Sequence, residues 1–169
     1  NADHVIIQTP YVICNGYMYD VLQGISDHAK LQIVLNAVEK GSNPWGCTDY
    51  LNQKKKILET GADVYELMND YPVHTKAVLI NDRLSVVGSY NLDMRSTYLD
   101  TELMLVIDSE KLSQQIHETE SDYMEKSKEV LANGQETEGA KYQGKVLNRK
   151  KKLYYGVLRI IIRPLRQLL

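Results

Sequence analysis

Short apolar runs of strand length alternate with amphipathic helical stretches along the chain, and this alternation restricts the possible folds more than any other feature. The runs expected as strands are residues 4–12, 31–35, 63–67, 73–80, 84–89 and 99–107. Helices are expected at about 17–29 and at 93–97. Another helix is expected to follow the loop 41–46 and to run to residue 60, where Gly61 is the stop signal. A long helix is expected after a cap at Asp108 or Ser109. The alternation predicts an α/β domain, with a mixed β-sheet flanked by helices.

The two runs 73–80 and 84–89 are close enough to form a hairpin. If Asn81 and Asp82 form a two-residue turn, as these residue types favour, the register follows directly. The expected cross-strand pairs are Ile80 with Arg83, Lys76 with Val87, and His74 with Ser89. Strand alternation then places the histidine and the lysine on one face of the hairpin.

This register predicts a single patch that contains an imidazole, an ammonium group, a hydroxyl and an amide. Its members are His74, Lys76, Ser89 and Asn91. Such a set offers a nucleophile or acid and three donors for the non-bridging oxygens of a phosphodiester. Asn91 also precedes an expected helical turn, where free N–H groups favour an anion. Each residue is unremarkable alone, so the expectation rests on their combination.

Residues 74–82 (HTKAVLIND), followed by residues 88–96 (GSYNLDMRS) and Glu102, resemble the phospholipase D superfamily. Within it, the chain is similar to the C-terminal half of a bacterial cardiolipin synthase-like enzyme, over about residues 3–130. The resemblance implies phosphatidyl transfer through a phosphohistidine, with a phosphatidylglycerol-like phospholipid as substrate and with no metal or cofactor.

The resemblance also implies a role for each matching residue. His74 is the catalytic histidine that acts as general acid and base, and Lys76 and Asn91 are phosphate ligands. Ser89 supports the site, and Glu102 is the carboxylate that orients a catalytic imidazole.

The implied mechanism needs two histidines, and only His74 is followed by a lysine in the family's pattern. The second is expected from an N-terminal half domain with its own HxK motif, so the chain alone is expected to be inactive. A homodimer that brings two copies of His74 together is the alternative source. The other three histidines, His4, His28 and His117, are expected to be ordinary surface residues.

Two positions depart from the family pattern. Asn81 occupies the position of the motif's aspartate, and the expected register places it in the turn, outside the phosphate patch. Asp100 stands where the family usually has asparagine, which adds a negative charge near the site.

Charge is distributed unevenly. Residues 145–169 contain eight Lys or Arg and no acid, whereas the rest of the chain carries 12 basic and 22 acidic residues. We expect a catalytic half domain at 3–132, a polar linker at 133–148 and a basic amphipathic segment at 149–169. If helical, this last segment either packs on the domain or lies on an anionic membrane, with Lys152, Arg159, Arg163 and Arg166 on one face.

No run of 18 apolar residues is present, so no membrane span is expected. The start at Asn1 suggests that native sequence precedes it. The expected location is the cytoplasmic face of a membrane, peripheral or tethered by a missing N-terminal segment.

Three functions remain open on the sequence: cardiolipin synthase-like transfer, a single-motif homodimeric phosphodiesterase or nuclease, and a catalytically weak membrane adaptor. The acidic body argues against nucleic acid as a partner, because phosphate backbones require clustered cations. The complete set of motif residues argues against the adaptor.

Overall fold

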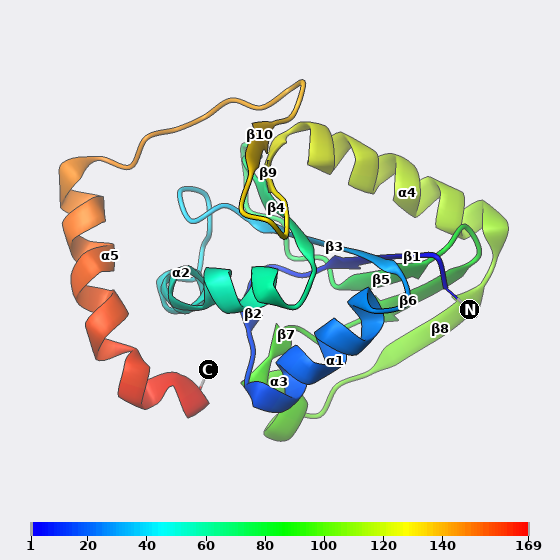
Figure 1. Cartoon of the computed structure of the whole chain (residues 1–169), viewed down its shortest axis with the longest axis horizontal. Coiled ribbons are helices and arrows are strands. Elements are labelled where there is room, and N and C mark those ends of the chain that lie inside the picture. Colours follow the sequence, from blue (N-terminus) through cyan, green and yellow to red (C-terminus); the bar gives the residue numbers. More distant parts are fainter. Residues whose placement is uncertain (1, 169) are drawn as a thin grey trace.

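The computed structural model describes residues 2–168. Eight strands form one mixed sheet in the order β10-β9-β4-β3-β1-β5-β6-β8, and β2 pairs with β7 in a separate two-stranded ladder (Figure 1). The strands are β1 His4–Gln8, β2 Val12–Ile13, β3 Lys30–Asn36, β4 Asp63–Leu67, β5 Ala77–Ile80, β6 Leu84–Gly88, β7 Leu92–Asp93, β8 Met104–Asp108, β9 Ser127–Val130 and β10 Glu136–Glu138. The helices are α1 Gly16–Ser26, α2 Pro44–Glu59, α3 Met94–Tyr98, α4 Glu110–Glu125 and α5 Arg149–Ile161, followed by the 3-10 helix η1 Arg163–Leu168.

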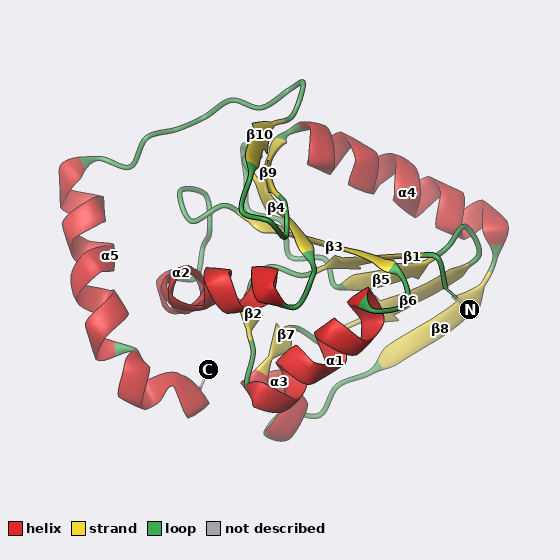
Figure 2. Ribbon diagram, viewed as in Figure 1, coloured by secondary structure: helices red, strands yellow, loops and turns green. Residues whose placement is uncertain are grey.

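Helices cover both faces of the sheet, as the expected α/β class requires (Figure 2). Strands β1, β3 and β4 run parallel, and the remaining neighbours in the large sheet are antiparallel. Alternate residues of β1 point to opposite faces. Val5 and Ile7 pack with α1 and α2, whereas Ile6 packs in the cluster under α4.

Local capping sets the helix boundaries. The side chains of Asn15 and Asn43 accept N–H bonds at the starts of α1 and α2, and Ser109 does the same for α4, as expected. Gly61 follows α2 with a φ of 87°, which glycine adopts without steric cost. The predicted stop signal at this position is therefore confirmed.

The hairpin β5–β6 exists, but its expected register was wrong by one residue. Ile80 pairs with Leu84 and Ala77 with Val87, so the turn contains three residues, 81–83. Asn81 has a φ of 51°, and its side chain accepts N–H bonds from Asp3 and His4. These bonds fix the longer turn against the start of β1.

Strand β5 is also shorter than expected. The run 73–80 was expected to be a strand throughout, yet only Ala77–Ile80 is one, and residues 72–76 have no regular structure. Gly88 N–H donates to the Lys76 carbonyl at 3.3 Å, so the glycine, not Val87, lies opposite the lysine.

Strands β9 and β10 were not expected. Residues 133–148 were predicted to be a polar linker, but they contain β10, which pairs with β9, and β9 extends the sheet beyond β4. Both strands are rich in charged residues, so no apolar alternation marks them in the sequence. Ion pairs stabilise them: Lys128 lies 3.1 Å from Glu66 and 3.5 Å from Glu136.

The basic C-terminal segment packs on the domain. Tyr155, Leu158 and Ile162 are buried, and α5 lies against α2. The helix ends at Ile161, and η1 continues through Pro164, a residue that cannot continue an α-helix. Among the other apolar side chains of this segment, Tyr154, Val157, Ile161 and Leu165 are exposed. Among residues 2–168 no helix has both the length and the apolar character needed to cross a bilayer.

Glu120 on the inner face of α4 carries a buried carboxyl group. It is 1% exposed, and neither carboxyl oxygen has a hydrogen-bond partner among the described residues. Burial raises the pKa of Glu120 to about 8. The folded protein therefore keeps this carboxyl neutral at pH 7, while the unfolded chain ionises it.

We expect Glu120→Gln to stabilise the fold by roughly 2 to 3 kcal/mol at pH 7 and by nothing measurable at pH 4. Between these values the unfolded carboxyl ionises and the folded one does not, so wild-type stability falls as pH rises. Urea unfolding at both pH values measures the difference, with the exposed Glu118→Gln on the same helix as control. Equal stabilisation at both pH values would contradict the explanation.

Candidate active site

His74 and Lys76 lie in the irregular segment just before β5. Lys76 is buried, and its Nζ lies 2.5 Å from His74 Nδ1 and 2.8 Å from the His74 carbonyl oxygen. The His74 side chain is exposed to solvent. The ammonium group is thus held directly beside an accessible imidazole.

Burial and neighbouring charges shift the pKa values of both groups. Partial burial and the neighbouring Lys76 ammonium lower the pKa of His74. Burial lowers the pKa of Lys76, while the carboxylates of Glu102 and Asp93 oppose that effect. A lowered imidazole pKa means that the neutral ring, which can accept a proton, predominates near neutral pH.

Ser89 and Glu102 form a second pair at the ends of β6 and β8. The Ser89 hydroxyl donates to the Glu102 carboxylate and accepts the Leu103 N–H at 3.0 Å. The hydrogen bond from Ser89 lowers the pKa of Glu102, with smaller contributions from Ser96 and Lys76. The site therefore holds an ionised carboxylate within the electrostatic reach of the lysine.

Asn91 is held by the short helix α3. Ser96 Oγ accepts the Asn91 backbone N–H at 3.2 Å and its side-chain Nδ2 at 3.4 Å. The Asn91 Oδ1 atom is buried and has no protein partner in the described structure. Asp93, which is 3% exposed, caps α3 by accepting the Ser96 N–H at 2.6 Å.

The ladder of β2 with β7 fixes this loop to the rest of the domain. Val12 pairs with Leu92 and Ile13 with Asp93, and Thr9 Oγ accepts the Leu92 N–H at 3.2 Å. Asp93, Ser96 and Thr9 are supporting residues that the sequence reasoning missed. The Asp-x-x-Ser spacing is a helix-capping pattern that could have indicated the first two.

The structure places five of the predicted residues at one end of the β5–β6 hairpin. They are His74, Lys76, Ser89, Asn91 and Glu102. Asn81 lies at the opposite end of β5, five residues and about 16 Å along the chain from the lysine. Asp100 forms an ion pair with Arg95 at 3.0 Å, so its additional charge has a partner.

The other histidines have structural contacts away from this end. His4 Nε2 lies 2.6 Å from Gln32 Oε1, and the His4 ring stacks on His117 at 6.1 Å. His117 Nε2 lies 2.9 Å from the Asn81 carbonyl, and His28 Nδ1 lies 2.9 Å from the Gly24 carbonyl. Within the described residues, no group of three His, Cys, Asp or Glu side chains is arranged to hold a metal ion.

A family model described as the phospholipase D-like domain of cardiolipin synthase matches residues 2–122, which include all five clustered residues. The chain belongs to this family. The cardiolipin synthase A of Proteus mirabilis is 30% identical over 150 residues, which cover 86% of this chain and 29% of that protein. The enzyme of the same name from Serratia proteamaculans is 28% identical over 152 residues. The phospholipase D-like domain thus spans less than a third of the length of these relatives.

Solved structures support the fold. Phosphatidylserine synthase from Haemophilus influenzae superposes with a TM-score of 0.69 at 16% identity, over 99% of this chain and 42% of that one. Nuc, a phospholipase D family member from Salmonella typhimurium, superposes with a TM-score of 0.62 at 15% identity, over 76% of this chain and 82% of that one. At these identities the likeness establishes the mixed-sheet fold.

Proposed function

We propose that this phospholipase D-like domain supplies one half-site for phosphatidyl transfer on a phosphatidylglycerol-like phospholipid. The observation that carries the proposal is the contact between the buried Lys76 ammonium and the exposed His74 imidazole. Beside this pair lie a hydroxyl, an amide and an ionised carboxylate. The curated relatives, which are named cardiolipin synthases, support the choice of a phospholipid substrate.

In the proposed reaction, a histidine of the second half-site attacks phosphorus and forms a phosphohistidine. The bond from phosphorus to the leaving alcohol breaks, and His74 gives that alcohol its proton. The bound phosphodiester favours the protonated imidazole, because an anion nearby stabilises the cation. Neutral His74 then takes the proton of an incoming alcohol, which attacks phosphorus and releases the second histidine.

Lys76 and Asn91 stabilise the negative charge that develops on the non-bridging phosphate oxygens. The amide Nδ2 of Asn91 and the ammonium of Lys76 are donors of the required kind. Glu102 contacts Ser89 in this chain, so the imidazole that it orients in the complete site is assigned to the second half-site. We propose no metal or cofactor, since Lys76 supplies the positive charge.

We further propose that the domain lies on an anionic membrane through the outer face of α5. This face exposes Leu153, Tyr154, Val157, Ile160 and Ile161, while the inner face packs on α2. Residues 149–152 (RKKK) add four cations at the start of the same helix, each worth roughly 1 kcal/mol near an anionic surface. An amphipathic helix of this kind lies in the headgroup plane.

We expect His74→Asn to remove phosphatidylglycerol turnover from the longer protein that contains both half-sites. Asparagine keeps a polar side chain but cannot transfer a proton near neutral pH, so we expect a loss of at least about 100-fold. His28→Asn is the matched control, because His28 lies just after α1 and its Nδ1 contacts the Gly24 carbonyl, away from His74 and Lys76. Activity of His74→Asn within a few-fold of wild type would refute the assignment.

We expect Ile160→Glu to reduce binding to phosphatidylglycerol vesicles at least about 5-fold, because an exposed isoleucine on the membrane face contributes apolar burial. Val106→Glu on the edge strand β8 is a control of matched exposure: Ile160 is 70% exposed and Val106 is 71%. Vesicle sedimentation of both variants decides the point. Equal losses, or none, would contradict binding through α5.

A further inference from the structure

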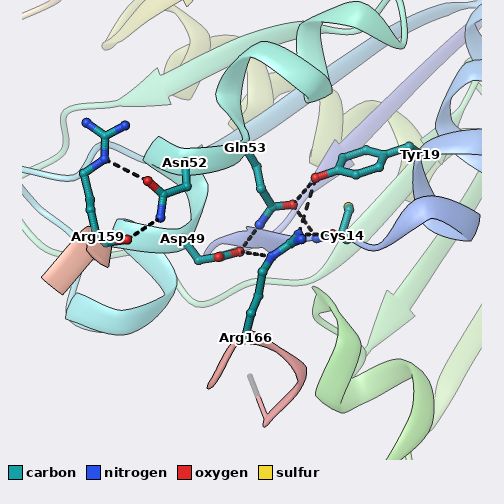
Figure 3. Close-up of polar contacts among 7 residues, drawn as sticks. All are labelled: Cys14, Tyr19, Asp49, Asn52, Gln53, Arg159 and Arg166. Carbon is teal, nitrogen blue, oxygen red and sulfur yellow. Dashed lines mark hydrogen bonds and ion pairs between the residues drawn. The ribbon is translucent and has the colours of Figure 1, made fainter. Parts of the chain in front are cut away.

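Arg166, at the C-terminal end of the chain, enters a buried polar cluster between α1 and α2 (Figure 3). Its Nε donates to Asp49 Oδ2 at 3.1 Å, and its Nη2 donates to the Cys14 carbonyl and, at 3.4 Å, to the Tyr19 hydroxyl oxygen. Asp49 is 1% exposed. Arg166 thus forms an ion pair with the buried Asp49 carboxylate and also donates a hydrogen bond to the carbonyl of Cys14, 152 residues earlier in the sequence.

Gln53 completes the cluster from α2. Its Oε1 accepts the Cys14 N–H at 2.8 Å and the Tyr19 hydroxyl at 2.5 Å, and its Nε2 donates to Asp49. Both backbone polar groups of Cys14 are therefore bound by side chains of α2 and η1. These bonds fix the backbone just after β2, and Figure 3 shows Gln53, Arg166 and Tyr19 meeting beside Cys14.

Cys14 lies one residue beyond β2, and β2 pairs with β7, which directly follows Asn91. Ile13 pairs with Asp93 in β7, and the Asp93 N–H donates to the Asn91 carbonyl at 2.8 Å. The 3-10 helix η1 also packs against α3, whose Ser96 holds the Asn91 amide. The C-terminal segment thus contacts α3 and the residue that follows β2, and α3 and the β2–β7 ladder are the elements that position Asn91.

We propose that Arg166 is a positioning residue, through which the C-terminal 3-10 helix holds the β2–β7 ladder and thereby orients Asn91. The consequence for phosphate binding rests on the proposed function, whereas the mechanical link from Arg166 to the loop 89–96 does not. The two parts of the basic C-terminal segment, α5 and η1, therefore have separate roles. The outer side of α5 meets the membrane, and η1 orders the active-site loop.

Arg159 provides a matched control on the same segment. Its Nε donates to Asn52 Oδ1 at 2.9 Å, and its carbonyl accepts from Asn52 Nδ2 at 3.1 Å. Like Arg166 it joins the C-terminal segment to α2, but it makes no bond to Cys14 or Tyr19. Loss of Arg159 should weaken the docking of α5 without releasing β2.

Removal of Arg166 alone leaves Asp49 buried without its cation, which can unfold the domain. The test therefore includes the double variant Arg166→Ala with Asp49→Asn, which leaves no unpaired charge. Arg166→Lys keeps the positive charge but loses the planar fork that reaches the carbonyl and the carboxylate together.

The first measurement is amide hydrogen exchange of the 169-residue chain. We expect the double variant to accelerate exchange of residues 89–96 at least about 5-fold relative to strands β3 and β4, Arg166→Lys to accelerate it less, and Arg159→Ala to leave it unchanged. Unchanged exchange at 89–96, or equal acceleration in Arg159→Ala, would overturn the link.

The second measurement is a titration with inorganic phosphate, followed by NMR at the Asn91 amide. Weaker binding in the double variant by about 5-fold, with partial recovery in Arg166→Lys, is the expected result. Unchanged affinity would refute the positioning role. Absence of phosphate binding in the wild-type chain would instead contradict the proposed function, and the exchange data would still decide whether Arg166 orders the loop.

Discussion

The three-residue turn between β5 and β6 determines where the candidate site lies. Asn81 adopts a left-handed conformation there, its side chain caps two N–H groups at the start of β1, and its carbonyl lies 2.9 Å from His117 Nε2 on α4. These bonds join the turn to a central strand and to the helix that covers it. Because strand register is propagated along the ladder, the turn fixes which residues meet at the other end. There the Lys76 carbonyl faces Gly88, and Ser89 begins the loop that carries Asn91.

The sequence was sufficient for the fold class and for most of the helices and strands in the first 126 residues, because apolar periodicity and capping residues are local signals. It was insufficient for the hairpin register. A two-residue and a three-residue turn are both compatible with Asn81 and Asp82, and only the contacts of Asn81 with β1 distinguish them. Strands β9 and β10 were missed for a related reason, since their stability comes from pairing with β4 and from ion pairs distant in sequence.

For the candidate site too, contacts between residues close in the sequence could be predicted, whereas contacts between distant residues could not. His74 and Lys76 lie two residues apart in an irregular segment, and their contact does not depend on a shared strand face. The position of Asn81 in the turn, at the end of β5 away from His74 and Lys76, was predicted and is confirmed despite the register error. The contribution of Arg166 could not be predicted, because its partners Asp49 and Cys14 precede it by more than 100 residues.

We propose that this domain supplies one histidine of a two-histidine site. The most direct test measures phosphodiesterase activity of the purified 169-residue chain over a concentration series, with its mass determined by light scattering in the same samples. If the domain supplies a single half-site, we expect no turnover at any concentration, whatever the mass. Turnover that rises in proportion to a dimer fraction would contradict it, because two copies of His74 would then form a complete site.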